Sequence, residues 1–239
     1  WPFPVDLLTS DQAELIQLIS QSSGGYHLGA ETATKLIHLA QTSIGISFGM
    51  DGARLRLQTL INQINFYKQQ LQPLRRELRK LIQEIEYAKR IMTLPGIGLI
   101  STARFLGNLG DLNNFAKVNQ LLDLAGLDLI SSESGKFKSR RQISHRGKSG
   151  LRCILYQMTC HFVRFPNTAR RKFLSCRVHN KLYRQAIVAA IPHLVRTIFA
   201  VAKGDQIYQP PQSNDPLLNE IKSLQAVLKE QQKRVKKAA

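Results

Sequence analysis

The chain has 239 residues, enough for one large domain or two modest ones, and 43% of them are hydrophobic, so a buried core can form. Its 34 lysines and arginines outnumber its 16 acidic residues, which gives a formal net charge of +18. An excess of this size excludes a protein that is indifferent to polyanions and indicates nucleic acid as the partner.

Cysteine usage and hydropathy indicate the compartment. The three cysteines form no CxxC pair and stand in apolar surroundings, so we expect reduced, buried thiols in a reducing, cytoplasmic environment. We expect no membrane partner, because Pro192, His193 and Arg196 interrupt the most apolar stretch, residues 186–202. The sequence starts at Trp1 without a methionine, which is consistent with a fragment of a longer protein.

Residues 1–50 are predicted to form a helical hairpin. After an extended, proline-rich lead, Thr9 or Ser10 can cap a helix that runs to Ile19. Glycines then turn the chain into a second helix over residues 30–42.

Residues 51–92 carry the pattern of a long coiled-coil helix. Apolar side chains recur at alternating spacings of three and four, and Pro73 predicts either a kink or two abutting helices near Gln72. The stripe alone fits a solvated helix that forms a homo-oligomer. Its polar face, however, holds nine lysines and arginines between Arg54 and Arg90 against three glutamates, and this bias indicates nucleic acid alongside.

A tight turn with the sequence LPGIG follows at residues 94–98. It resembles a helix-hairpin-helix, in which amides and a helix N-terminus hold a phosphate, so Gly96, Ile97 and Gly98 are candidate nucleic-acid contacts. The alternative is a plain helical turn. The letters also fit a GxGxxS dinucleotide pattern, but no strand precedes them, so that function is discarded.

A strongly basic stretch covers residues 131–152, SSESGKFKSRRQISHRGKSGLR. Glycine and serine fill the gaps between the charges, which predicts a mobile backbone that can approach a ligand closely. The stretch is either a solvated surface loop or a polyanion-binding loop. Its candidate phosphate contacts are Lys136, Lys138, Arg140, Arg141, Arg146, Lys148 and Arg152.

Six serines in the same stretch are candidate nucleophiles. A serine hydroxyl that attacks a phosphodiester needs cations to neutralise the charge that develops on the non-bridging oxygens, and arginine suits that task. Ser134 precedes Gly135 and has room to reach a backbone phosphate. Pattern alone does not single out one serine, because serines in such loops mostly serve solubility.

The remaining segments are predicted to be helical. Helices are expected over residues 116–125 and 154–163, and a buried helix that is broken or bent at Pro192 is expected over 186–203. Residues 164–184 form a second basic surface, and residues 217–235 form a basic amphipathic tail helix. The expected fold is mainly α, with a compact helical domain after the coiled coil. The predicted domains are residues 1–50, 51–92, 93–208 and 209–239.

A metal site and a tyrosine recombinase site are the two other kinds of active site to consider. Six scattered histidines and few acidic residues offer no metal cluster, so we expect no metal site and no cofactor within this chain, and no complete metal-dependent nuclease. His161 and Arg164 form an HxxR pattern with Tyr183 downstream, as a tyrosine recombinase requires. That pattern is weak, and His161 lies on an apolar helix face where a core or capping histidine is commoner.

The order of short motifs is more specific than any one of them. The motifs are LPGIG at 94–98, LGDLNNF at 109–115, LAGL at 124–127, SGK at 134–136, ISHRGKSGLR at 143–152 and a final AIVAAI…LVR…Y that ends at Tyr208. From residue 22 to Tyr208 the chain closely resembles the coiled coil and C-terminal transposase domain of the DEDD-type insertion-sequence transposases. These are relatives of the Piv invertase, and some of them are guided by a bridge RNA.

The resemblance implies a nucleophile and partners. The Ser-Gly motif of that family supplies the nucleophile, which falls on Ser134, and cleavage would pass through a phosphoserine before exchange and rejoining. DNA, and in the RNA-guided group a guide RNA, would be the partners. The family's acidic RuvC-like domain binds metal through three Asp and one Glu, and both halves build the active site.

This chain departs from the family in two ways. It shows no stretch like the acidic domain, so it resembles a C-terminal portion or a truncated gene, and Mg²⁺ is expected only with that missing domain. Leu129 and Ile130 also stand where relatives commonly have a proline. We therefore expect either the serine-bearing part of a DNA transposase, inactive alone, or a non-catalytic module for nucleic-acid binding and oligomerisation.

Overall fold

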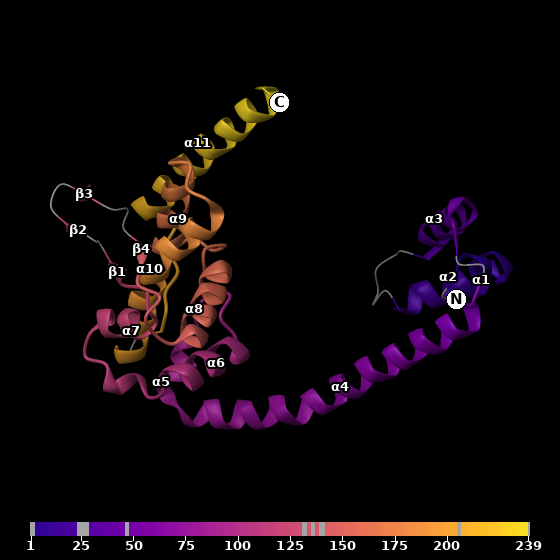
Figure 1. The fold of residues 1–239 in the computed structure, drawn as a ribbon, viewed down its shortest axis with the longest axis horizontal. Helices are drawn as coiled ribbons and strands as arrows, with labels where there is room; N and C mark the ends of the chain where they lie inside the picture. The colour runs from indigo at the N-terminus through magenta and orange to yellow at the C-terminus, as the bar shows by residue number, and fades with distance from the viewer. Residues whose placement is uncertain are drawn as a thin grey trace. The chain divides into compact units, whose positions relative to one another are not determined.

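The computed structural model describes residues 3–22, 29–45, 48–130, 133–134, 137–138, 142–204 and 207–238. The chain divides into two compact units, Trp1–Pro73 and Leu74–Ala239. Helices make up most of the described residues of both units (Figure 1), which confirms the mainly α fold.

The first unit is a small helical bundle followed by the start of a long helix. Its short helices are α1 (Pro4–Thr9), α2 (Gln12–Ser22) and α3 (Gly29–Thr42). Both α1 and α2 pack against α3, and Leu15, Ala33 and Ala40 are buried between them. The expected helical hairpin is α2 with α3, although its glycine turn lies outside the described residues.

The lead before α2 is helical from Pro4 onward, so the prediction of an extended lead is wrong at its end. A proline in the first helical turn has no hydrogen bond to lose. The Asp6 carboxylate accepts a hydrogen bond from the Phe3 N–H at 3.3 Å and pairs with Arg54, whose guanidinium lies 5.6 Å from the centre of the Phe3 ring. These contacts fix the start of α1.

The long helix α4 (Met50–Glu84) is the helix of the predicted coiled coil. It runs through Pro73, so the alternative of two abutting helices is wrong. A proline inside a helix removes one hydrogen bond, and the turns on either side retain theirs. The interruption falls instead at Ile85, whose extended backbone separates α4 from α5 (Glu86–Ile91).

The apolar stripe of α4 is exposed over most of its length. Its members include Leu57, Leu60, Ile64, Tyr67, Leu71 and Leu74, with exposed fractions between 40% and 65%. A coiled coil buries such a stripe against a partner helix. Pairing with a second copy of the chain stays a prediction.

The second unit contains the other helices. In chain order they are α5, α6 (Leu99–Leu109), α7 (Val118–Leu124), α8 (Ser149–Phe162), α9 (Thr168–Val178), α10 (Tyr183–Lys203) and α11 (Pro216–Ala238), with a 3₁₀ turn at Leu112–Asn114. α10 is the core helix: it packs against α5, α7, α8 and α9 and has ten buried residues. It continues through Pro192, so the predicted break there is absent.

Among the described residues, one helix, α10, has the length and apolarity of a membrane span. Its apolar residues, however, form the interior of the second unit, where Ile187, Ile191 and Leu194 have no exposed surface. The hydropathy of α10 is accounted for by this burial.

The basic tail helix α11 is docked on α9. Ile221 is buried, the Glu220 carboxylate pairs with Arg171 of α9 at 3.0 Å, and the Gln231 side-chain amide donates to the Val178 carbonyl at 3.2 Å. The predicted tail is therefore a packed part of the second unit.

Four two-residue strands lie in or directly before the basic stretch. They are β1 (Leu129–Ile130), β2 (Glu133–Ser134), β3 (Phe137–Lys138) and β4 (Gln142–Ile143). β1 pairs with β4 and β2 with β3, both antiparallel, so these residues form strands rather than the expected loop, and the mobility of the backbone stays a prediction. The apolar side chains of Leu129, Ile130 and Ile143 favour strand pairing in β1 and β4.

Candidate nucleic-acid interface

The two antiparallel ladders β1–β4 and β2–β3 together are called the hairpin, and Ser134 is the last residue of β2. Leu129 faces Ile143 in the β1–β4 ladder, and Ser134 faces Phe137 in the β2–β3 ladder. In Figure 1, β2 and β3 lie beyond β1 and β4, away from the helices of the second unit. The predicted nucleophile therefore lies at the far end of the hairpin.

The base of the hairpin is a close backbone crossing of two predicted motifs. Gly126 has a φ of +64°, a region that favours glycine. A Cβ on Gly147 would lie 2.5 Å from the Leu124 carbonyl oxygen and 2.6 Å from the Gly126 nitrogen. Lys148 N–H donates to that Leu124 carbonyl at 2.8 Å, and His145 N–H donates to the Gly126 carbonyl at 3.1 Å. The LAGL and ISHRGK motifs thus fix where the hairpin leaves the helices.

Side chains reinforce the same base. The Ser144 hydroxyl donates to the Asp128 carboxylate, and Ser144 N–H donates to the Asp128 carbonyl at 2.9 Å. The Arg152 guanidinium donates to the Ala125 carbonyl at 2.9 Å and to the His145 carbonyl at 3.5 Å. Arg152, a predicted phosphate contact, therefore has a structural task, and its contact with phosphate stays a prediction.

Sequence reasoning missed Asp128 and Ser144 as a pair. The available signal was that Asp128 is an acid just before a strongly basic stretch, where a charge needs a nearby partner or hydrogen-bond donor. Their separation of 16 residues hid the contact, because only the β1–β4 pairing brings them together.

The predicted cations of the hairpin are described in part. Arg146 and Lys148 are exposed, and the Lys148 ammonium donates to the Asn108 carbonyl, at the end of α6, at 3.3 Å. Only the backbone is described for Ser134 and Lys138. Three further predicted contacts lie outside the described residues: Lys136, Arg140 and Arg141.

The LPGIG turn joins α5 to α6 and packs against the end of α8. Gly96 has a φ of +79°, and a Cβ there would lie 3.2 Å from His161 Cβ. Ile97 is buried. Gly98 faces open space, and its N–H donates to the Ser101 hydroxyl at 3.0 Å. Gly96 and Ile97 therefore serve packing, and Gly98 is the member of the predicted set with room for a ligand.

The structure separates the two predicted phosphate-binding regions. The LPGIG turn precedes the first residue of α6, whereas Asn108, near its last residue, contacts the hairpin base. A Cβ on Gly150 would also lie 2.2 Å from the Asn108 side chain, so α8 starts directly against this end. A helix of this length places its ends about 15 Å apart. The two regions can contact one nucleic acid only at separate phosphates.

The second predicted basic surface is only partly available. The Arg170 guanidinium donates to the carbonyls of Val163 at 2.9 Å and Arg164 at 2.6 Å, and Arg171 pairs with Glu220. These two cations hold the fold together. The exposed cations of this segment are Arg164, Lys172, Lys181 and Arg184.

The tyrosine alternative gains no support from the environment of Tyr183. Burial raises the pKa of the Tyr183 hydroxyl and the neighbouring Cys160 thiol adds to the rise, and together they outweigh the charge of Arg164, which lowers this pKa. A nucleophilic tyrosine needs the opposite shift. His161 is exposed beside the LPGIG turn rather than in the core. Across the described residues, His, Cys, Asp and Glu side chains form no group of three able to hold a metal.

Comparison with known proteins points to insertion elements. Residues 88–174 match the model of a family described as "Transposase IS116/IS110/IS902 family". An uncharacterized 44.8 kDa protein of insertion element IS116 from Streptomyces clavuligerus is 24% identical over 178 residues, which are 74% of this chain and 45% of that protein. The transposase of IS1328 from Yersinia enterocolitica is 31% identical over 104 residues, which are 43% of this chain and 31% of that protein.

A third relative is an uncharacterized 42 kDa protein of insertion element IS900 from Mycobacterium paratuberculosis, 26% identical over 125 residues. The chain spans less than half the length of each of these relatives. The match to the family model runs from α5 to α9 and so includes both the LPGIG turn and the whole hairpin.

Proposed function

We propose that this chain is the DNA-binding part of an insertion-element transposase and that it acts in DNA transposition and recombination. The observation that carries the proposal is the match of residues 88–174 to a transposase family model, over the segment that forms the basic hairpin. The net charge of +18 supports a polyanionic partner independently.

Ser134 is the proposed nucleophile. Its oxygen forms a bond to the phosphorus of a DNA phosphodiester as the bond from that phosphorus to one strand end breaks. The serine proton passes to a base, and the released strand oxygen takes up a proton. Attack by another strand's hydroxyl reverses these steps, restores the serine and completes the exchange. The position of Ser134 in the β2–β3 ladder, away from the helices of the second unit (Figure 1), supports this role, because that end of the hairpin can reach DNA while the base stays fixed.

The hairpin cations are the proposed phosphate ligands. Lys136, Lys138, Arg140, Arg141, Arg146 and Lys148 would neutralise charge near the scissile phosphate, and arginine can do so through two parallel hydrogen bonds. Gly98 would add a contact at the start of α6. A divalent ion such as Mg²⁺ belongs to the acidic domain of the complete protein in this proposal.

Oligomerisation and RNA binding complete the proposal. The exposed stripe of α4 supports pairing with a second copy of the chain in the cytoplasm. A guide RNA is a further proposed partner, and the excess of positive charge could serve an RNA as well as DNA.

The test is a search for a covalent adduct between protein and DNA. The chain is joined to or mixed with the acidic domain of its relatives and given an insertion-element end, Mg²⁺ and a candidate guide RNA. We expect a protease-sensitive DNA adduct that disappears in Ser134→Ala. Ser149→Ala, which removes a serine at the start of α8, is the matched control. An adduct that persists in Ser134→Ala would contradict the assignment.

The second candidate is a non-catalytic module for nucleic-acid binding and oligomerisation. The exposed stripe of α4 and the separation of the two phosphate-binding regions support this second candidate as well as they support the first. It shares the binding predictions and differs in one outcome: no adduct forms under any of the conditions above, although DNA binding and oligomerisation are intact.

A further inference from the structure

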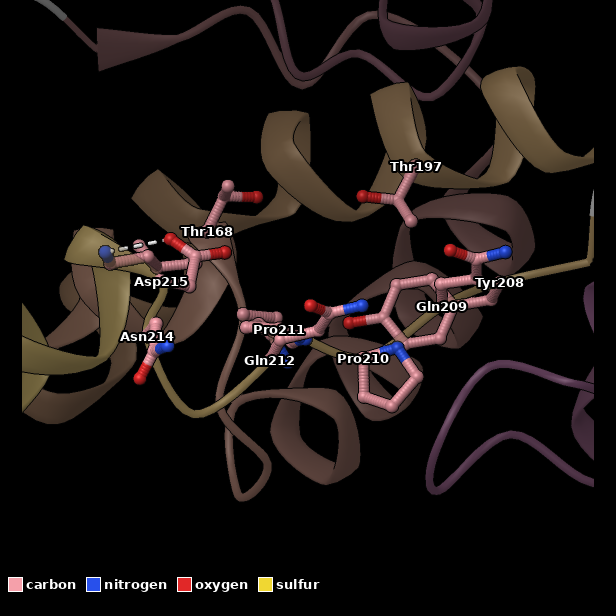
Figure 2. Close-up of a pocket in the computed structure, with 11 residues that line it drawn as sticks. Thr168, Thr197, Tyr208, Gln209, Pro210, Pro211, Gln212, Asn214 and Asp215 are labelled. Atoms are coloured by element: carbon pink, nitrogen blue, oxygen red, sulfur yellow. Dashed lines mark hydrogen bonds between the residues drawn. The ribbon is translucent and has the colours of Figure 1, made fainter.

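A groove lies between α9, α10 and the linker that precedes α11. Its larger part holds about 550 Å³ and is lined by Thr168 of α9, Thr197 of α10 and linker residues from Tyr208 onward. Figure 2 shows the two threonines on one side and Tyr208, Pro210 and Pro211 across from them. An adjoining part of about 470 Å³ shares Thr168, Thr197 and Tyr208. Together the two parts are large enough for one nucleotide.

Some polar groups of the lining are committed to the fold. The Asn167 side chain caps α9 by accepting the Arg170 N–H at 2.8 Å, and the Asp215 carboxylate accepts the Leu217 N–H at 2.9 Å. Other groups have no hydrogen-bond partner among the described residues. These are the hydroxyls of Thr168 and Tyr208 and the side-chain amides of Gln209, Gln212 and Asn214.

Tyr208 is held as a rigid wall of the larger part. Its ring meets the Phe162 ring edge to face with centroids 6.1 Å apart, and its N–H donates to the Thr93 hydroxyl at 3.3 Å. Pro210 and Pro211 restrict the linker that follows. An aromatic ring beside two prolines gives a flat apolar surface on which a base can stack.

The smaller part carries one exposed cation beside apolar residues such as Ala200, Val201 and Ile207. It is lined by His193 and Arg196 of α10, and Arg196 is exposed. Lys172 and Arg171 of α9 add positive charge at His193. Arg171 is already paired with Glu220, so Arg196 and Lys172 are the cations most able to meet a phosphate.

We propose that this groove binds one unpaired nucleotide of a single-stranded nucleic acid. The base lies in the larger part against Tyr208, and its phosphate lies at Arg196. Side-chain amides such as Gln209 and Gln212 present a donor and an acceptor together, as the edge of an unpaired base does. A base inside a duplex has its edge paired and its faces stacked, so it does not fit.

The inference rests on the proposed function for its nucleic-acid partner and adds a site outside the hairpin. Most of the lining comes from residues 193–217, beyond the region that matches the transposase family model. Both displaced DNA and a guide RNA contain unpaired nucleotides. The chemistry of recognition is the same for both sources, and the experiment separates them.

The test uses the full chain and single strands of about twelve nucleotides, uridine RNA and deoxyuridine DNA, beside a DNA duplex of the same length. Each single strand carries one 5-iodouracil for photocrosslinking. The variants are Arg196→Gln and Gln212→Ala. Arg184→Gln is the control, because it removes an exposed charge of the same type from the same helix.

We expect both groove variants to weaken single-strand binding about fivefold or more, with duplex binding within about twofold of wild type. We expect the crosslink on Tyr208, which reports the site even if a variant folds poorly. Preference for the RNA strand assigns the site to RNA, and preference for the DNA strand assigns it to displaced DNA.

Single-strand binding that survives both substitutions, or a crosslink that maps only to the hairpin, would overturn the proposal. So would equal losses in Arg196→Gln and Arg184→Gln, which indicate bulk charge alone. Loss of duplex binding after hairpin substitutions tests the proposed function separately, because those substitutions leave the groove intact.

Discussion

At the scale of single residues, the glycines of the motifs are explained by close backbone contacts. Gly126 needs its positive φ, and Gly147 has no room for a Cβ between two backbone atoms of the preceding segment. Sequence order alone identified these motifs, but not that LAGL and ISHRGK lie against each other. The contact joins residues about twenty positions apart, and no local periodicity reports it.

Gly147→Ala tests this contact. The added methyl group must push the Leu124 carbonyl and the Gly126 nitrogen apart, so we expect a loss of about 1–3 kcal/mol in the free energy of unfolding, measured by urea denaturation. Gly107→Ala in α6 is the control, because a Cβ there meets nothing within 4 Å. It should leave stability equal or raise it by about 0.5–1 kcal/mol. Equal effects of the two substitutions would contradict the crossing.

His193 gives a pH dependence with a defined sign. Burial lowers its pKa below the usual value of 6.5, and the charges of Arg196, Lys172 and Arg171 lower it further. The unfolded chain then takes up this proton at higher pH than the folded chain does. The stability that comes from neutral His193 is present above about pH 6.5 and declines as the pH falls through and below that value.

The measurement is thermal unfolding of the wild type and His193→Asn from about pH 8 to about pH 5.5. We expect the wild type to lose more stability than the variant as the pH falls, and the stability difference between the two proteins at about pH 8 sets the baseline. A variant that loses stability as steeply as the wild type would show that His193 is not responsible.

At the scale of elements, the hairpin base works as a clamp. The Asp128 carboxylate receives the Ser144 hydroxyl at the start of the ladder that leads to Ser134. Asp128→Ala should leave the fold intact and let the base open more often. We expect hydrogen exchange at the Ser144 and His145 amides to quicken about fivefold to tenfold, which corresponds to the loss of one hydrogen bond.

Asp123→Ala is the matched control, because it removes the same carboxylate from an exposed position on α7, five residues earlier. Exchange at Ser144 and His145 should then stay at the wild-type rate. Unaltered exchange in Asp128→Ala itself would mean that the backbone crossing alone holds the hairpin.

α4 supplies a prediction for the oligomer. Ile64 is 53% exposed on the apolar stripe. A glutamate at this position would place an unpaired charge in the interface between α4 and a coiled-coil partner. We expect Ile64→Glu to reduce the molar mass measured by light scattering to that of one chain, whereas Asn62→Glu, off the stripe, should not. A wild type that is already a single chain at micromolar concentration would contradict pairing through α4.

Element types were more predictable than their contacts. The periodicity of α4 and the apolar run of α10 indicated both helices, because each reflects burial or pairing of one helix face. The strands of the basic stretch were missed, since their length of two residues carries no alternation to detect. The groove at Tyr208 was also missed, because it is built from a linker and two helices that only packing brings together.

At the scale of the whole molecule, positive charge is the property on which the proposed function relies. Of the predicted cations, Arg152 and Arg170 hold protein carbonyls, whereas Arg146 is exposed at the hairpin. Lys148 belongs to both groups, because it is exposed and also donates to the Asn108 carbonyl. Fold-holding cations should matter for stability, and hairpin cations should matter for DNA. This division cannot be made from the sequence, where all of them look alike.

The most direct measurement is the salt dependence of DNA binding by the full chain and by a variant with Lys136, Lys138, Arg140 and Arg141 changed to Gln. Removing one cation that binds a phosphate should reduce the slope of log affinity against log salt by about 0.9. We expect a steep slope for the wild type and a slope lower by about 3 or more for the variant, with unaltered thermal stability. An equal slope in the two proteins, or a flat response in the wild type, would contradict the hairpin as the DNA interface.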